Sequence, residues 1–266
     1  AKPFAMKPLE IITPELVYGT KPILKEPCLI GNWVLWLEQR PKEKGRTTAM
    51  IRPWKSLGKK PQELTPFPID LRTRVHGYGG NPLSVSKNSD ELLLVWIDDS
   101  NGCLWQQRWL GLENIERNLS GKLKPIHSPI CLSSPSNAFF ADGLIDQQRD
   151  LWLGVMESDG KDFLVTFSLK EECKLPRIIY SCKDFLGYLS ISPTGNELAW
   201  VEWEQPLMPW DASNLHWAKL GEKGTIVETL NLLPGHAADG LTRSVFQPIW
   251  TDSGDLLIAE DSQGWW

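Results

Sequence analysis

A short apolar segment that ends in a carboxylate recurs along the chain. Each segment is rich in Leu, Val, Ile or Trp and is too short for a helix, so it predicts a β-strand. The terminal acids lie 45 to 60 residues apart. Periods of about 40–50 residues, with several strands in each unit, are typical of β-propeller blades, and longer intervals indicate loop insertions. The five segments are 33–38, 92–98, 151–157, 198–202 and 256–260.

Tight turns precede three of these segments. The stretches 192–197 (Ser-Pro-Thr-Gly-Asn-Glu) and 251–255 (Thr-Asp-Ser-Gly-Asp) both place Gly where the chain must turn into a strand. The stretch 86–91 has the same polar character without Gly. The sequence therefore predicts an all-β protein with about five propeller blades, the last of them incomplete, as part of a larger, seven-bladed ring.

Two alternatives to this interpretation stay open. In 105–119 the apolar residues follow a helical period, which favours either a short helix or, as we interpret it, a strand that continues into a loop. The recurring segments would also fit an all-β sandwich or barrel without a true repeat.

The charge of the chain argues against nucleic acid as a partner. The net charge is −5, from 28 basic and 33 acidic residues, and no basic tract stands out. Phosphate binding requires a clustered positive face. Tryptophan is abundant, at 14 residues, which suits the packed faces of stacked sheets better than sugar or base stacking.

The cysteines and histidines predict no metal site and no cofactor. An odd count of five cysteines, none in a Cys-x-x-Cys pair, indicates reduced thiols in the cytoplasm. The four histidines are scattered, whereas a zinc site needs ligands at short spacing. We expect Cys173 and Cys182, which flank a strand-like stretch, to be buried thiols. No apolar run is long enough to span a membrane, and the N-terminal residues lack the apolar core of a signal peptide.

Four segments of the chain stand out in sequence, namely Arg72-Thr-Arg-Val-His-Gly-Tyr-Gly-Gly80, Phe140-Ala-Asp142 with Asp150-Leu-Trp152, Glu202-Trp-Glu-Gln-Pro-Leu-Met-Pro-Trp-Asp211, and Val245-Phe-Gln-Pro-Ile-Trp250 with Gly264-Trp-Trp266. Together they resemble the prolyl oligopeptidase family, in particular its acylaminoacyl-peptidase-like serine peptidases. The first segment departs from the family pattern at Gly77, where Glu is common, and Asn81, which follows it, stands where a third Gly is expected.

The resemblance implies a parent protein with two domains. In that family a propeller restricts access to a C-terminal α/β-hydrolase domain, whose Ser-Asp-His triad cleaves short or N-acylated peptides. This sequence contains no Gly-x-Ser-x-Gly motif, so we expect the catalytic domain to be absent and assign no catalytic residue. We expect residues 1–22 to form an N-terminal extension and 23–266 to form a propeller truncated in its last blade.

The resemblance also suggests residues for substrate gating or for contact between domains. Two guanidinium groups in the 72–80 loop could hold carboxylates, although the loop could instead clasp one blade to another, with Arg paired to a neighbouring acid. The Met208-Pro-Trp-Asp211 loop could shape a pocket rim, or could be a rigid connection held by its prolines. The candidates are Arg72, Arg74, His76, Tyr78, Trp210 and Asp211.

Three functions fit these observations. The first is the gating propeller of a prolyl oligopeptidase-like serine peptidase, with its own hydrolase domain and short peptides as partners. The second is a non-enzymatic propeller that serves as a scaffold for protein or peptide binding. The third is an independent propeller enzyme such as a metal-dependent lactonase, whose axial ligands a sequence does not reveal.

Overall fold

The computed structural model describes residues 13, 19, 21–55, 58–113, 122–236 and 240–264. Strands dominate this part of the chain, which contains no α-helix and two short 3-10 helices, η1 (Pro41–Glu43) and η2 (Val75–Gly77). The strands form five separate antiparallel sheets, which we call blades 1 to 5. The chain is therefore all-β, as the sequence predicted, although Trp265 and Trp266 of the last motif lie outside the described residues.

Within each blade the strands pair in chain order, except that the fifth strand of blade 2 pairs with the third. Blade 1 contains β1 (Ile23–Ile30), β2 (Trp33–Arg40), β3 (Arg46–Pro53) and β4 (Gln62–Glu63). Blade 2 contains β5 (Leu83–Asn88), β6 (Glu91–Ile97), β7 (Leu104–Leu110), β8 (Lys124–Pro125) and β9 (Ile130–Cys131). Blade 3 contains β10 (Phe139–Asp146), β11 (Leu151–Ser158), β12 (Lys161–Ser168) and β13 (Arg177–Ser181). Blade 4 contains β14 (Phe185–Ile191), β15 (Glu197–Trp203), β16 (Asn214–Leu220) and β17 (Ile226–Leu233), and blade 5 contains β18 (Val245–Trp250) and β19 (Leu256–Glu260).

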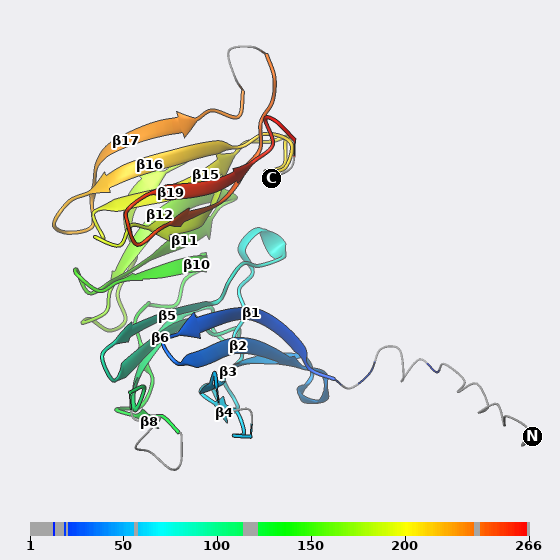
Figure 1. Ribbon diagram of the computed structural model, residues 1–266, viewed down its shortest axis with the longest axis vertical. Helices are drawn as coiled ribbons and strands as arrows, with labels where there is room; N and C mark the ends of the chain where they lie inside the picture. Colours follow the sequence, from blue (N-terminus) through cyan, green and yellow to red (C-terminus); the bar gives the residue numbers. More distant parts are fainter. Residues whose placement is uncertain are drawn as a thin grey trace, which may run out of the picture.

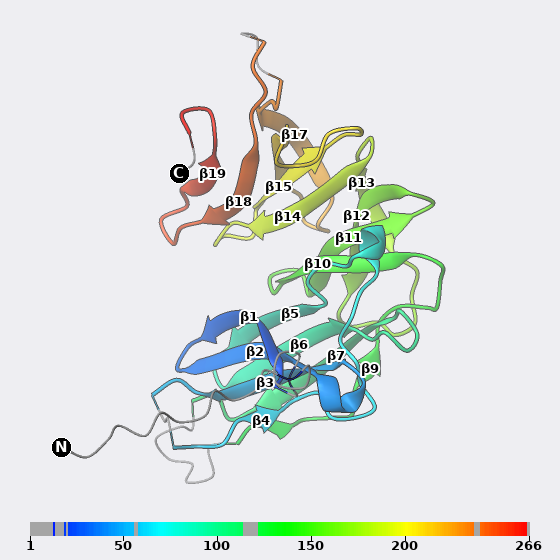
Figure 2. The ribbon, with the colours of Figure 1, turned by 90° about the vertical axis from the view of Figure 1, so that its right-hand side faces the viewer.

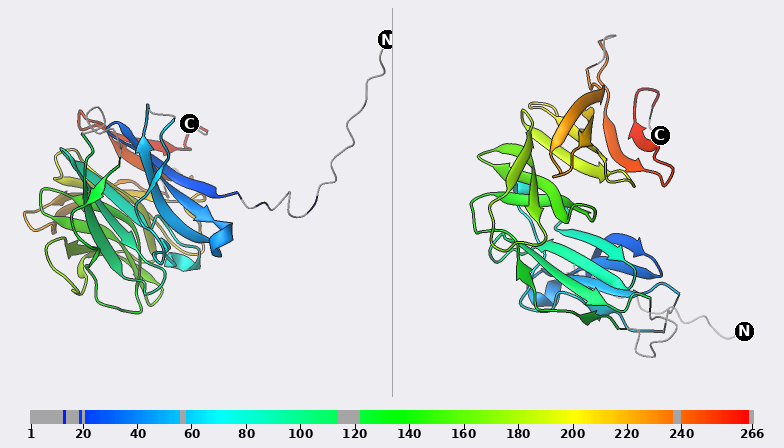
Figure 3. Two further views of the ribbon diagram at one scale, coloured as in Figure 1. Left: turned by 90° about the horizontal axis from the view of Figure 1, so that it is seen from below. Right: turned by 90° about the vertical axis from the view of Figure 1, so that its left-hand side faces the viewer.

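The blades succeed one another along an arc. Blade 1, in blue, and blade 5, in red, lie at its two ends (Figures 1, 2 and 3). The first strands of the blades face the inside of this arc, where β10 lies against both β5 and β14, and β14 lies against β18. This radial arrangement is that of a β-propeller.

The five recurring segments each form the second strand of a different blade, namely β2, β6, β11, β15 and β19. This confirms the blade assignment. The predicted turns are present as well: Gly195 and Gly254 adopt φ values of 67° and 91°, and their N–H groups close the turns on Ser192 and Thr251. The segment that begins at Trp105 runs along β7, which confirms a strand rather than a helix as far as Leu110; residues 114–119 are outside the described part.

The apolar segments are continuous because both faces of each second strand are covered. In β6, Leu92 and Leu94 pack towards blade 1, whereas Leu93 and Val95 pack towards blade 3. The hydrophobic cores therefore lie between blades rather than inside them, and four of them join the five blades in succession.

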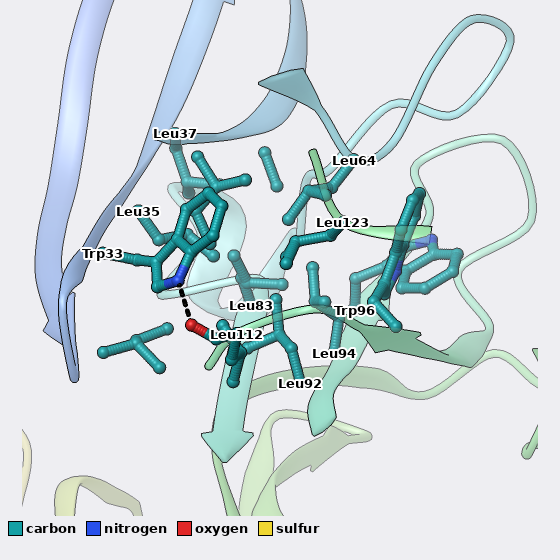
Figure 4. Close-up of a cluster of buried hydrophobic side chains, with 14 of the residues drawn as sticks. Trp33, Leu35, Leu37, Leu64, Leu83, Leu92, Leu94, Trp96, Leu112 and Leu123 are labelled. Carbon is teal, nitrogen blue, oxygen red and sulfur yellow. Dashed lines mark hydrogen bonds between the residues drawn. The ribbon is translucent and has the colours of Figure 1, made fainter. Parts of the chain in front are cut away.

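Tryptophans of the second strands are central to these cores. The largest fully buried side chains include Trp33, Trp96, Trp152 and Trp200, one in each of the first four blades. Figure 4 shows the core between blades 1 and 2, where Nε1 of Trp33 donates a hydrogen bond to the carbonyl oxygen of Leu112 at 2.8 Å. The indole thus meets its single polar requirement inside an apolar cluster.

Candidate functional site

The loop between β4 and β5, which connects blade 1 to blade 2, also contacts the first strand of blade 3. The hydroxyl group of Thr73 donates to the carbonyl oxygen of Phe140. The N–H of Asn81 donates to Oδ1 of Asp142 at 2.7 Å, and the N–H of Asp142 donates back to the carbonyl oxygen of Asn81 at 3.0 Å. These bonds fix the loop, which contains the first resemblance motif, against β10.

His76 is the centre of this attachment. Its backbone N–H donates to the carboxylate of Glu157 in β11, and its Nε2 lies 2.8 Å from Oδ2 of Asp162 in β12. Asp162 is fully buried and also accepts the N–H of Leu186 in blade 4 at 2.9 Å. One carboxylate thus joins the loop to two blades.

The protonation of His76 follows from this environment. Burial by itself would lower the pKa of the imidazole, but the hydrogen bond and the negative charge of Asp162 outweigh it, so the pKa is raised above its ordinary value of 6.5. Its ring also packs edge-on against Phe185, with ring centroids 4.9 Å apart. His76 is therefore a blade-to-blade clasp, a role that the sequence interpretation gave to the arginines.

Glycine at position 80 allows the loop to approach β10 closely. A Cβ atom there would lie 2.9 Å from Cβ of Ala141 and 2.9 Å from Oδ1 of Asp142, closer than real Cβ contacts. The close packing against β10 therefore explains why the first motif ends in glycine at position 80.

We expect Gly80→Ala to lower the free energy of unfolding by about 1–3 kcal/mol, because an added methyl group in a packed site forces its neighbours to move. The measurement is a chemical denaturation midpoint. Gly58→Ala is the matched control, because nothing lies within 4 Å of a Cβ built there. An unchanged midpoint for Gly80→Ala would show that the loop is not held against β10.

The structure places the two predicted arginines in one cavity and His76 and Trp210 in another, and Tyr78 borders both cavities. Arg74 forms an exposed ion pair, at 3.0 Å, with Asp99, which follows β6 of blade 2. Arg72 and Arg74 line a cavity of about 500 Å³ together with Lys25 and Glu26 of blade 1. Asp211 accepts the N–H of Met208 at 3.0 Å and so closes the turn of its own loop.

A second cavity of about 500 Å³ brings His76, Tyr78 and Trp210 together. Its wall also contains Asp142 of β10, Tyr188 of β14 and Trp203 of β15. We call it the aromatic cavity. Most of its lining is aromatic or apolar, and the exposed side chains of Tyr78 and Trp210 border it.

Asp142, Tyr188 and Trp203 are residues of this cavity that the sequence interpretation did not single out. Asp142 and Trp203 lie within the sequence motifs that resemble the prolyl oligopeptidase family. Membership in these motifs was the signal that could have identified the two residues. Burial raises the pKa of Asp142, and the charges of Glu26 and Asp162 add to this, whereas the Asn81 N–H and His76 act in the opposite direction.

The cysteines differ in part from the expectation. Cys182 is buried, as predicted, but Cys173 is exposed, so its prediction was wrong. Cys173 lies in the connection between β12 and β13 rather than inside a core. In the described ranges, no group of three or more His, Cys, Asp or Glu residues is placed to hold a metal ion.

Solved structures of known proteins contain the same fold. No protein-family model and no curated protein matches the sequence. The structure is similar to a Mycobacterium tuberculosis puromycin-hydrolyzing peptidase, with a TM-score of 0.74 and 27% identity over 96% of this chain. The chain resembles the propeller part of prolyl oligopeptidase-family peptidases. This confirms the resemblance found in the sequence motifs.

Two structures of a puromycin hydrolase give the same fold. They have TM-scores of 0.76 and 0.77 at 24% identity, and one of them is complexed with PGG. The chain spans 37–39% of the length of these peptidases. No helix in the described part of the chain is long and apolar enough to cross a membrane.

Proposed function

We propose that the chain is the substrate-gating propeller of a serine peptidase that acts on short peptides or aminoacyl compounds. The fold similarity to the propeller part of puromycin-hydrolysing peptidases carries this proposal. In the complete protein, the propeller would cover a linked α/β-hydrolase domain, which would supply the Ser-Asp-His triad. We place the protein in the cytoplasm, and the free cysteines of the described residues support this assignment.

The aromatic cavity supports the gating role. It lies where the inner strands β10 and β14 meet the loops that contain His76 and Trp210. Its volume of about 500 Å³ is suited to a ligand of a few residues. The contact between His76 and Asp162 holds one wall of the cavity in place. The cavity can therefore select ligands by their shape, in addition to excluding water.

A chimera tests the gating role. We would replace the aligned part of the M. tuberculosis peptidase with this chain and compare hydrolysis of an aminoacyl-nitroanilide with that of unfolded casein. We expect the chimera to react with a fluorophosphonate probe and to prefer the short substrate at least tenfold, because the propeller covers the catalytic serine.

The chain by itself is the control. Because it has no Gly-x-Ser-x-Gly motif, we expect neither probe labelling nor turnover above the blank. A chimera that cleaves casein as readily as the short substrate would contradict gating, and labelling of the isolated chain would contradict the absence of a nucleophile.

A further inference from the structure

Three of the five cysteines lie together where blade 2 meets blade 3. Cys131 ends β9 and pairs with Trp105 of β7. Cys103 stands two residues before Trp105, so it is the diagonal neighbour of Cys131 on the same face of the sheet. The backbone N–H of Cys173, in the connection between β12 and β13, donates to the carbonyl oxygen of Cys131 at 3.1 Å. We call these three residues the thiol cluster.

The backbone holds Cys173 beside Cys131. The hydroxyl group of Ser134 donates to the carbonyl oxygen of Cys173 at 2.6 Å, and the N–H of Lys174 donates to the carbonyl oxygen of Leu132 at 2.9 Å. Cys173 adopts a φ of 51°, a conformation that residues other than glycine rarely adopt. The two blades are therefore joined at this point by a short, fixed set of backbone contacts.

This arrangement meets the geometric requirement of a disulfide bond. The two Cα atoms of a disulfide lie about 4.4–6.8 Å apart. Residues of neighbouring strands that share a backbone hydrogen bond lie roughly 5.5 Å apart, and Cys131 and Cys173 share such a bond. A bond between their sulfur atoms therefore requires no separation of blades 2 and 3.

An oxidant reaches the thiol cluster from the side of Cys173. Cys173 is exposed, Cys131 is partly buried, and Cys103 is buried, with its thiol directed at the carbonyl oxygen of Asn101 at 3.7 Å. The thiolate is the reactive form of a cysteine. Burial raises the pKa of Cys131 to about 12, and the thiols of Cys103 and Cys173 add to this increase. Cys173 is therefore the thiol that an oxidant meets first, and Cys131 is the second thiol beside it.

We propose that Cys131 and Cys173 form a reversible disulfide bond when the protein meets a peroxide. The thiolate of Cys173 attacks one peroxide oxygen, the O–O bond breaks, and a sulfenic acid forms as hydroxide leaves. The sulfur of Cys131 then attacks the sulfenic sulfur, the S–O bond breaks, and water leaves with the thiol proton of Cys131. With hydrogen peroxide as the oxidant, two thiols and one peroxide give one disulfide and two waters.

The disulfide would link β9 of blade 2 covalently to the β12–β13 connection of blade 3. Disulfides in a reducing compartment are usually transient and respond to oxidants, which suits a bond that forms between an exposed and a partly buried thiol. The proposal does not rest on the proposed function, because the thiol cluster needs neither a hydrolase domain nor a bound peptide.

Peroxide treatment of the reduced 266-residue chain tests the proposal. Remaining thiols are blocked with N-ethylmaleimide, and peptides from a digest without reductant are identified by mass spectrometry. We expect the chain to lose two of its five thiols and to yield one linked peptide pair that contains Cys131 and Cys173. The midpoint of thermal unfolding should rise by about 5 °C or more, because the bond closes a long loop. Dithiothreitol should reverse both changes.

Two variants complete the experiment. Cys173→Ser should remove the linked pair and the rise in the midpoint. Cys28→Ser is the matched control, because this partly buried cysteine lies in β1 of blade 1, outside the thiol cluster, so the linked pair should still form.

The wild-type digest decides the proposal even if a variant fails to fold. A pair of Cys103 with Cys131, a bond between two chains, or oxidation of Cys173 to a sulfinic acid without any linked pair would overturn it. None of these results affects the chimera experiment, which decides the proposed function separately.

Discussion

Replacement of His76 with alanine is expected to lower the free energy of unfolding by about 3 kcal/mol, the size of effect seen when one partner of a buried ion pair is removed. Asp162 is fully buried, and within the described residues its carboxylate would then keep only the N–H of Leu186 as a hydrogen-bond donor. The loop between β4 and β5 would lose its ion pair with blade 3 and keep only its backbone and hydroxyl hydrogen bonds. The measurement is urea denaturation followed by tryptophan fluorescence.

Arg74→Ala is the control for this substitution. Arg74 belongs to the same loop and also forms an ion pair, but its side chain is 60% exposed, and exposed pairs contribute about 0–1 kcal/mol. A loss of stability as large as that of His76→Ala would show that the loop as a whole, and not the buried pair, determines the result.

The difference between wild type and His76→Ala should also depend on pH. Folding raises the pKa of His76 above its ordinary value of 6.5, so the protonated form is the one that folding favours. Its contribution is complete below that ordinary value and is lost as the pH rises through the raised value. The variant should therefore differ more from wild type at pH 6 than at pH 9. A difference that grows with pH would contradict an imidazolium paired with Asp162.

The 266-residue chain should associate at micromolar concentration. Leu24 and Leu29 are exposed by 66% and 65% on the face of blade 1 turned away from blade 2, and Ile249 and Leu257 by 59% and 57% on the face of blade 5 turned away from blade 4. In the blades between these two ends, the equivalent faces are covered by the neighbouring blade. Uncovered apolar blade faces promote association and bind hydrophobic dyes.

Sedimentation velocity and dye fluorescence measure this association. Leu29→Ser combined with Leu257→Ser should shift the distribution towards the monomer. Leu175→Ser is the control, because this leucine is 75% exposed but lies between β12 and β13, away from the two end faces. A wild-type monomer with a cooperative melt and no dye binding would mean that the two end faces do not need to be covered.

The blade architecture was predictable because burial on both faces leaves a continuous apolar run in the sequence. Leu92 to Ile97 form such a run, and the turn residues around Gly195 mark where a strand begins. The presence of a recurring unit therefore required no knowledge of contacts. The number of strands in each blade was less visible, because outer strands such as β8 and β9 contain two residues each.

The candidate site was predictable only in part, because its residues meet through the arrangement of blades. His76 and Asp162 are 86 positions apart in the sequence, and nothing in the Lys161–Ser168 strand marks one acid as a partner. Asp142 lies at a β-bulge of β10, which breaks the alternation that sequence patterns rely on. Arg72 and Arg74 were prominent because of their charge, yet the structure keeps them outside the aromatic cavity.

The position of the cores between blades has a consequence for how the chain tolerates change. Neighbouring residues of one strand serve different contacts: Leu93 supports the association of blades 2 and 3, and Leu94 that of blades 1 and 2. In the part of the chain that the structure describes, no blade encloses a core of its own. The cooperative unit is therefore the junction between two blades, as in a linear array with nearest-neighbour coupling. An amino-acid substitution at one junction can be compensated by a second substitution in either of the two blades that meet there. The more distant blades that form the aromatic cavity need not change.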